Sequence, residues 1–205
     1  MNKERRIREL AFFLAFFSFI SAVQAGQDNW TGHDGVSVST AVTVTEEQAV
    51  RFGNFSVQSP GGDDAYIVLD DNGGRTSHNG ASTQIMLLNG GVSDMGSQGP
   101  GYYLVSHAGA STNLYVTFTD HTGATITSCP AGNPIILYGP VGSGQFCVDS
   151  VTFNLTGTDG NGSYITTDGS GNATIRVGAT LHTMSGVSTY APGTYRGTFE
   201  VQISY

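Results

Sequence analysis

The residues of this 205-residue chain best suited to metal binding or nucleophilic chemistry are five histidines and two cysteines. Neither a His-Glu-x-x-His motif nor a zinc-type cysteine spacing occurs. No Gly-x-Ser-x-Gly sequence marks a serine nucleophile. The histidines stand singly among polar neighbours, so we expect surface residues at His33, His78, His107, His121 and His182. The sequence therefore predicts no catalytic residue, no metal site and no cofactor.

Two loops and three tyrosines are the remaining candidates for ligand binding. The i, i+2, i+4 spacing of oxygen ligands occurs at Asp159, Asn161 and Ser163 and again at Asp168, Ser170 and Asn172. Both loops lack the twelfth-position Glu that closes an EF-hand loop, so we favour hairpin turns. Tyr102, Tyr103 and Tyr190 could stack on a sugar, although aromatic side chains in sheets more often pack across strands.

The first 25 residues are predicted to be a secretory signal peptide. Basic residues precede an apolar run over residues 10–23, which is shorter than the about 20 residues that span a membrane. Small residues before the end of this segment favour cleavage between Ala25 and Gly26. The alternative is an uncleaved N-terminal anchor. No second apolar stretch is long enough to span a bilayer, so we expect a protein exported to the periplasm and then to the cell surface or medium.

The mature chain would be acidic. It has four arginines, no lysine and 14 carboxylates, which give a formal charge of −10. Such a chain cannot neutralise a run of phosphates, so we expect no nucleic-acid partner. Export would place Cys129 and Cys147 in an oxidising compartment, where we expect one disulfide that contributes roughly 3 kcal/mol and leaves no free thiolate.

The mature sequence has the period-two alternation of β-strands. The clearest case is the C-terminus, where one apolar face contains Tyr195, Phe199, Val201, Ile203 and Tyr205. A second alternation runs over residues 36–45. Residues 114–118 and 151–155 also alternate, whereas the apolar runs 66–69, 85–88 and 135–138 suit more fully buried strands. Asp/Asn-Gly turns separate these segments, and no helical pattern exceeds two turns. The one local helix candidate is residues 45–48, which is too short to form a helix of any importance.

These strands predict an all-β fold, an antiparallel immunoglobulin-like β-sandwich. We expect one domain over residues 36–205, preceded by a flexible polar segment over residues 26–35.

Three segments also resemble a known family. Residues 50–55 (VRFGNF), residues 171–181 and the ending over residues 192–205 resemble the secreted bacterial domain of unknown function 4402 family. The ending is also similar to that of subunits of archaic chaperone-usher pili, including the spore-coat U-like proteins. The resemblance spans about residues 36–205 and implies a surface or fibre protein rather than an enzyme.

A physical argument leads to the same function. A sandwich that lacks its last strand has an open apolar groove, which an extended segment of a neighbour can fill. The predicted donor residues are Val36, Val38, Thr40, Val42 and Val44. The alternative is that these residues form the first strand of a complete domain. We thus expect a non-enzymatic structural subunit that associates with itself or with sister subunits, and with a periplasmic chaperone. The runner-up is a secreted monomeric binding module for carbohydrate or calcium.

Overall fold

The computed structural model describes residues 42–58, 65–88, 98–120, 122–126, 129 and 134–205. All of these residues fall within one compact unit, residues 39–205. The predicted signal peptide with its cleavage site at Ala25 and Gly26, the polar segment 26–35 and the donor candidates Val36, Val38 and Thr40 lie outside the described residues. Within the described ranges, no helix is long and apolar enough to cross a membrane.

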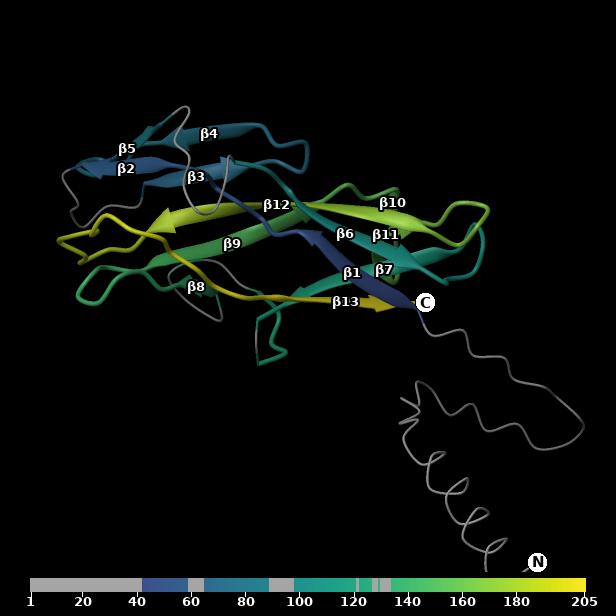
Figure 1. Cartoon of the computed structure of the whole chain (residues 1–205). Coiled ribbons are helices and arrows are strands. Elements are labelled where there is room, and N and C mark those ends of the chain that lie inside the picture. The colour runs from purple at the N-terminus through teal and green to yellow at the C-terminus, as the bar shows by residue number, and fades with distance from the viewer. Residues whose placement is uncertain (1–41, 59–64, 89–97, 121, 127–128, 130–133) are drawn as a thin grey trace, which may run out of the picture. The chain divides into compact units, whose positions relative to one another are not determined.

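The described part of the chain is all-β, as predicted, with antiparallel strand pairs (Figure 1). The strands are β1 (Thr43–Gln48), β2 (Phe55–Gln58), β3 (Tyr66–Leu69), β4 (Arg75–His78), β5 (Gln84–Leu87), β6 (Gly101–Ser106), β7 (Asn113–Thr119), β8 (Ile135–Leu137), β9 (Phe146–Phe153), β10 (Gly157–Asp159), β11 (Gly162–Thr166), β12 (Ala173–Thr183) and β13 (Glu200–Ser204).

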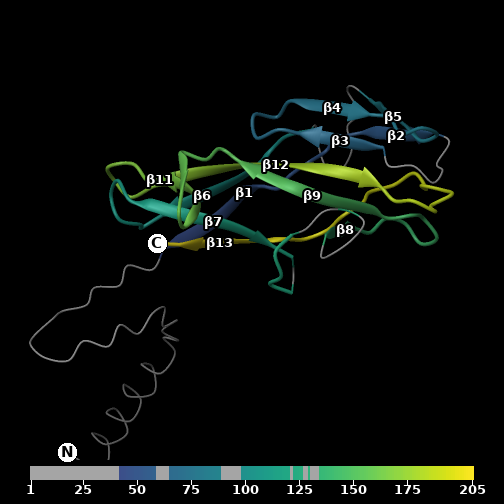
Figure 2. The same cartoon turned by 180° about the vertical axis from the view of Figure 1, so that it is seen from behind.

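Three sheets are formed from these strands. The largest has the order β1-β6-β12-β3-β4, and β9 pairs with both β12 and β8. The second has the order β10-β11-β7-β13, and β2 pairs with β5 in a third. In both views β12 runs alongside β9, its partner in the sheet (Figure 2). The long strand β12 therefore connects the two ends of the largest sheet.

The two larger sheets share one apolar core. Alternate residues of β7 point into it, and Leu114, Val116 and Phe118 are buried, as their spacing predicts. These side chains form one cluster with buried residues of the other sheet, among them Val105 and Ile175. The sheets therefore pack face to face, and burial of such apolar side chains is the main stabilising contribution to the fold.

The structure differs from the expected strands in three places. Only part of each apolar run is buried: Ile67 and Leu69 in the first, Ile85 in the second and Ile135 in the third, whereas Tyr138 is 62% exposed. Residues 45–48, the one local helix candidate, belong to β1. The C-terminal strand begins at Glu200 rather than at Tyr195, because residues 195–199 make only one isolated bridge, from Arg196 to Tyr138.

Candidate functional site

An apolar groove opens between the first and last segments of the described unit. Its volume is about 720 Å³. Its floor is the core face of β9 and β12, with Phe146, Val148, Ala179 and Leu181. One rim is residues 49–57 and the other is residues 190–199. The C-terminal segment from Tyr195 to Phe199 is part of the second rim.

Two tyrosines fix the C-terminal rim onto the floor. Tyr190 stacks on Phe146 with ring centroids 4.4 Å apart, and Tyr195 meets the same ring edge-on at 4.8 Å. The Tyr195 hydroxyl donates to the Ala191 carbonyl at 2.9 Å and also hydrogen-bonds Ser143. One face of the Tyr190 ring is therefore covered by Phe146. Ring packing instead of strand pairing thus positions this rim.

Arg75 fixes the opposite rim. Its Nη1 donates to the carbonyls of Phe52 and Asn54 at 2.7 and 3.1 Å, and its Nη2 to that of Leu88 at 3.3 Å. Between the two rim residues, Gly53 has φ +69°, and a Cβ there would lie 2.8 Å from the Arg75 guanidinium. The VRFGNF segment therefore needs glycine at this position.

Polar groups at the groove wall include an unusual arginine. The Nε of Arg51 is buried and has no hydrogen-bond partner among the described residues. Buried donors are almost always paired, so this atom calls for an acceptor. Tyr103 lines the same groove and is 7% exposed; burial, and to a lesser degree the charge of Glu46, raise its pKa to about 12. Its phenol is therefore neutral at physiological pH.

The remaining C-terminal and donor candidates among the described residues are divided between the domain core and the surface. Phe199, Val201 and Ile203 pack against the shared core cluster, whereas Tyr205 is exposed. Val42 packs against that cluster, and Val44 is exposed in β1. β1 pairs with β6 of the same chain. Val44 thus belongs to an intrachain strand, and Val42 directly precedes that strand.

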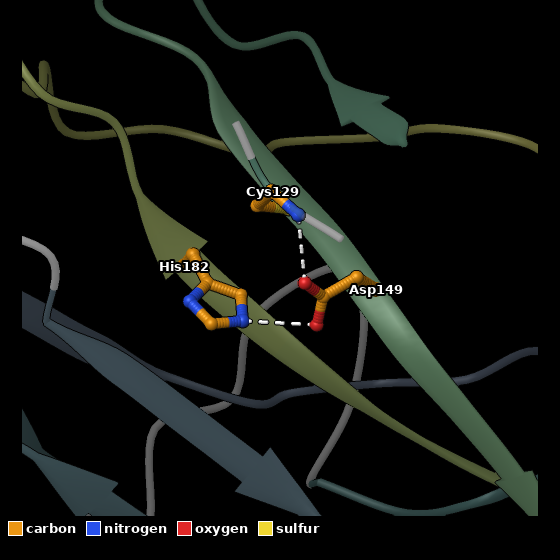
Figure 3. A group of neighbouring side chains, drawn as sticks. All are labelled: Cys129, Asp149 and His182. Carbon is orange, nitrogen blue, oxygen red and sulfur yellow. Dashed lines mark hydrogen bonds and ion pairs between the residues drawn. The ribbon is translucent and has the colours of Figure 1, made fainter. Parts of the chain in front are cut away.

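A second site lies on the other face of β9 and β12, around the predicted disulfide. Cys129 and Cys147 are bonded, with Cα atoms 6.0 Å apart. Asp149 accepts from the backbone N–H of Cys129 at 2.8 Å, and its other oxygen lies 2.9 Å from Nε2 of His182 (Figure 3). The side chain of His182 is only 14% exposed, so its interpretation as a surface residue is wrong.

Local backbone geometry brings this cluster together. In the antiparallel register His182 lies opposite Cys147, and Asp149 is two residues farther along β9 on the same face. Beyond Asp149 the register between β9 and β12 shifts, and Ser150 has φ +49°. Such a β-bulge, in which one strand has an extra residue, changes the direction of the neighbouring side chains. The sequence has the spacing Cys147-x-Asp149, but it does not reveal that His182 is paired with this segment.

The two calcium candidates are hydrogen-bonded turns. Oδ1 of Asp168 accepts the backbone N–H groups of Ser170 and Asn172, and Oδ1 of Asp159 accepts that of Asn161. These bonds lower the pKa of both aspartates, chiefly through the N–H groups of Asn172 and Asn161. The same turn recurs after Asp70 and Asp120. Each carboxylate therefore stabilises its own hairpin.

The proposed tyrosine platform is not assembled. Tyr102 and Tyr103 are adjacent in β6, so their side chains point to opposite faces of the sheet. Tyr190 lies in the groove floor cluster on Phe146. Tyr103 and Tyr190 both line the groove, but Tyr102 lies on the opposite face of β6 from Tyr103, so the three rings do not form one surface.

A comparison with family models identifies one family for this chain. The family model for the Domain of unknown function (DUF4402) matches residues 42–205, from the start of β1 to the last residue. The chain belongs to this family. Both the VRFGNF rim and the C-terminal rim of the groove lie within the matched residues. No curated protein matches the chain.

Proposed function

We propose that this protein is a structural subunit of a bacterial surface fibre, assembled when an extended segment of a neighbouring subunit fills the apolar groove. The observation that carries the proposal is the groove itself. It is open between the first and last segments of the unit, and its floor consists of core residues such as Phe146 and Leu181. Covering these side chains with another chain would bury more apolar surface.

The rims of the groove suit an added strand. Within the described ranges, residues 49–54 and 195–199 belong to no strand, and each segment makes a single isolated bridge. An extended segment laid between them can exchange backbone hydrogen bonds with either rim. It would also bring carbonyl groups to the wall that holds the Nε of Arg51.

The donated segment is residues 36–41 of the neighbour. Val44 is retained by the pairing of β1 with β6, and Val42 packs against the core cluster of its own subunit. Val36, Val38 and Thr40 then remain as alternating groove-facing residues. After cleavage at Ala25, residues 26–41 precede β1, and 16 extended residues reach up to roughly 50 Å. That length is sufficient for the tail to enter a second subunit.

Export and fold are part of the same proposal. The predicted signal peptide and the Cys129–Cys147 disulfide are compatible with a protein outside the cytoplasm. The facing antiparallel sheets support an immunoglobulin-like sandwich, and the C-terminal ending supports kinship with archaic chaperone-usher pilins. A periplasmic chaperone would protect the groove before assembly. No described contact favours the runner-up, a binding module for carbohydrate or calcium.

The test uses the mature protein without residues 26–41. We expect this variant to remain folded and monomeric, to form no filaments in electron micrographs, and to bind a synthetic peptide of residues 33–42. Binding is measured as an increase in melting temperature. A peptide with Val36→Asp and Val38→Asp should not bind, because these residues enter the apolar floor.

The matched control is a peptide with Ser37→Asp and Ser39→Asp, which adds the same charge on the opposite face of the strand. This peptide should stabilise the variant as the natural sequence does. Filaments formed without residues 26–41, or equal binding of both aspartate-containing peptides, would contradict the proposal.

A further inference from the structure

We propose that reduction of the Cys129–Cys147 disulfide creates a zinc(II) site, formed by both thiolates together with Asp149 and His182. This site is independent of the proposed fibre function. It lies on the opposite face of β9 and β12 from the groove, because Val148 and Leu181, which line the groove, alternate along these strands with the cluster residues.

The ligand atoms already converge. Sγ of Cys129, a carboxylate oxygen of Asp149 and a ring nitrogen of His182 all lie within 4.8 Å of one another. Figure 3 shows the imidazole and the carboxylate facing each other beneath Cys129. Zinc–ligand bonds of about 2.0–2.3 Å place tetrahedral ligands roughly 3.5 Å apart. A small inward movement therefore completes the geometry.

Cys147 supplies the fourth ligand. It is bonded to Cys129, it lies opposite His182 in the strand register, and it shares a face of β9 with Asp149. Two thiolates, one imidazole and one carboxylate are all donors that zinc accepts in tetrahedral sites.

Burial favours a cation here. Cys147 and Asp149 are 0% and 4% exposed. A buried carboxylate is stable only when it is paired, hydrogen-bonded or bound to a metal. In the disulfide form, the Cys129 N–H and His182 satisfy Asp149. In the reduced form, zinc would bind the same carboxylate and offset the charge of the two new thiolates.

The chemistry balances with a dithiol as reductant. The dithiol transfers two electrons to the Cys129–Cys147 bond, which breaks to give two thiols while the reductant becomes a disulfide. Each thiol then loses one proton to solvent as its sulfur binds zinc. A disulfide oxidant reverses the step: it accepts two electrons from the thiolates and two protons from solvent to become a dithiol, while the Cys129–Cys147 bond re-forms and zinc is released. The site therefore senses the loss of oxidising conditions.

The experiment uses the mature protein, reduced with a water-soluble phosphine, and cobalt(II) as a spectroscopic substitute for zinc. We expect one equivalent of cobalt to give thiolate-to-metal charge-transfer absorption and tetrahedral visible bands, both lost on addition of zinc. The disulfide form should give neither. His182→Ala and Asp149→Asn should each weaken cobalt binding by at least about tenfold.

His78→Ala is the matched control, because His78 is exposed on the same sheet and stacks on Tyr66 without belonging to the cluster. A second measurement needs no variant: one equivalent of zinc should protect both cysteines of the reduced protein from alkylation. Cobalt binding by the disulfide form, or unchanged affinity in both cluster variants, would overturn the proposal. So would a reduced protein whose β-type circular dichroism is lost and does not return with zinc.

Discussion

Single side chains hold the groove rims in place, among them that of Arg75. Its guanidinium donates to three backbone carbonyls from two chain segments. Hydrogen bonds to a charged donor are stronger than neutral ones, and each carbonyl left without a donor costs free energy.

We expect Arg75→Met to lower the free energy of unfolding by about 2 kcal/mol, measured by urea denaturation. Methionine keeps much of the apolar stem and removes only the donors. Arg196→Met is the control, because Arg196 is exposed and should change stability little. Equal effects of both substitutions would show that lost packing or charge, not the carbonyl contacts, matters.

The aspartate turns predict a pH dependence. Hydrogen bonds from Asn172 and Ser170 hold the pKa of Asp168 below its ordinary value of 3.8. The stabilisation is therefore complete above about pH 4 and is lost as pH falls through the lower pKa of the folded state.

Asp168→Ala should melt at a lower temperature than the natural protein at pH 7, and this difference in melting temperature should become smaller below pH 4. Thermal melts of both proteins from pH 7 to pH 3 measure the difference. Asp71→Ala is the control, since the Asp71 carboxylate accepts from a side-chain amide instead of backbone N–H groups. A difference in melting temperature that stays constant from pH 7 to pH 3 would show that ionisation of Asp168 does not stabilise the turn.

At the scale of elements, β12 is the strand on which most of the largest sheet depends. It pairs with β3, β6 and β9. At Gly178 it passes so close to the end of β3 that a Cβ would lie 2.4 Å from the Leu69 carbonyl oxygen. This contact is with backbone, which cannot move aside as a flexible side chain can.

Gly178→Ala should therefore destabilise the protein by about 2 kcal/mol or more, as overpacking does. Gly160→Ala is matched to it, since a Cβ at Gly160 meets no heavy atom within 4 Å. Urea denaturation of both variants measures the difference. A loss at Gly160 as large as that at Gly178 would contradict the steric explanation, because a Cβ at Gly160 meets no heavy atom and Gly→Ala by itself lowers the entropy of the unfolded chain.

The sequence predicts where strands form better than it predicts which strands pair with each other. Alternation correctly places the apolar face of β7 and of β13, because strand periodicity is a local property. It overextends the last strand to Tyr195, because Tyr195 packs on Phe146, a contact set by tertiary structure. His182 looks isolated for the same reason. Only the pairing of β12 with β9 brings it to Asp149, and no local pattern encodes that pairing.

At the scale of the whole molecule, the disulfide links Cys129 to β9, a strand of the largest sheet. It closes a loop between residues 18 apart in sequence, which restricts the unfolded chain.

Replacing both cysteines with serine should lower the free energy of unfolding by about 3 kcal/mol, measured in urea. The groove side chains face away from the disulfide, so binding of the peptide of residues 33–42 should persist at temperatures where the variant is folded. Unchanged stability would mean that the bond adds nothing to the fold.

The two faces of β9 and β12 have a mechanical consequence. In the proposed fibre, a strand held in the groove would rest on one side of this pair, and the disulfide lies on the other. Tension along a fibre would reach each subunit through its inserted strand and would load the β9–β12 ladder in shear. The resistance of such a fibre to stretching should then depend on whether two sulfur atoms on the reverse side are joined.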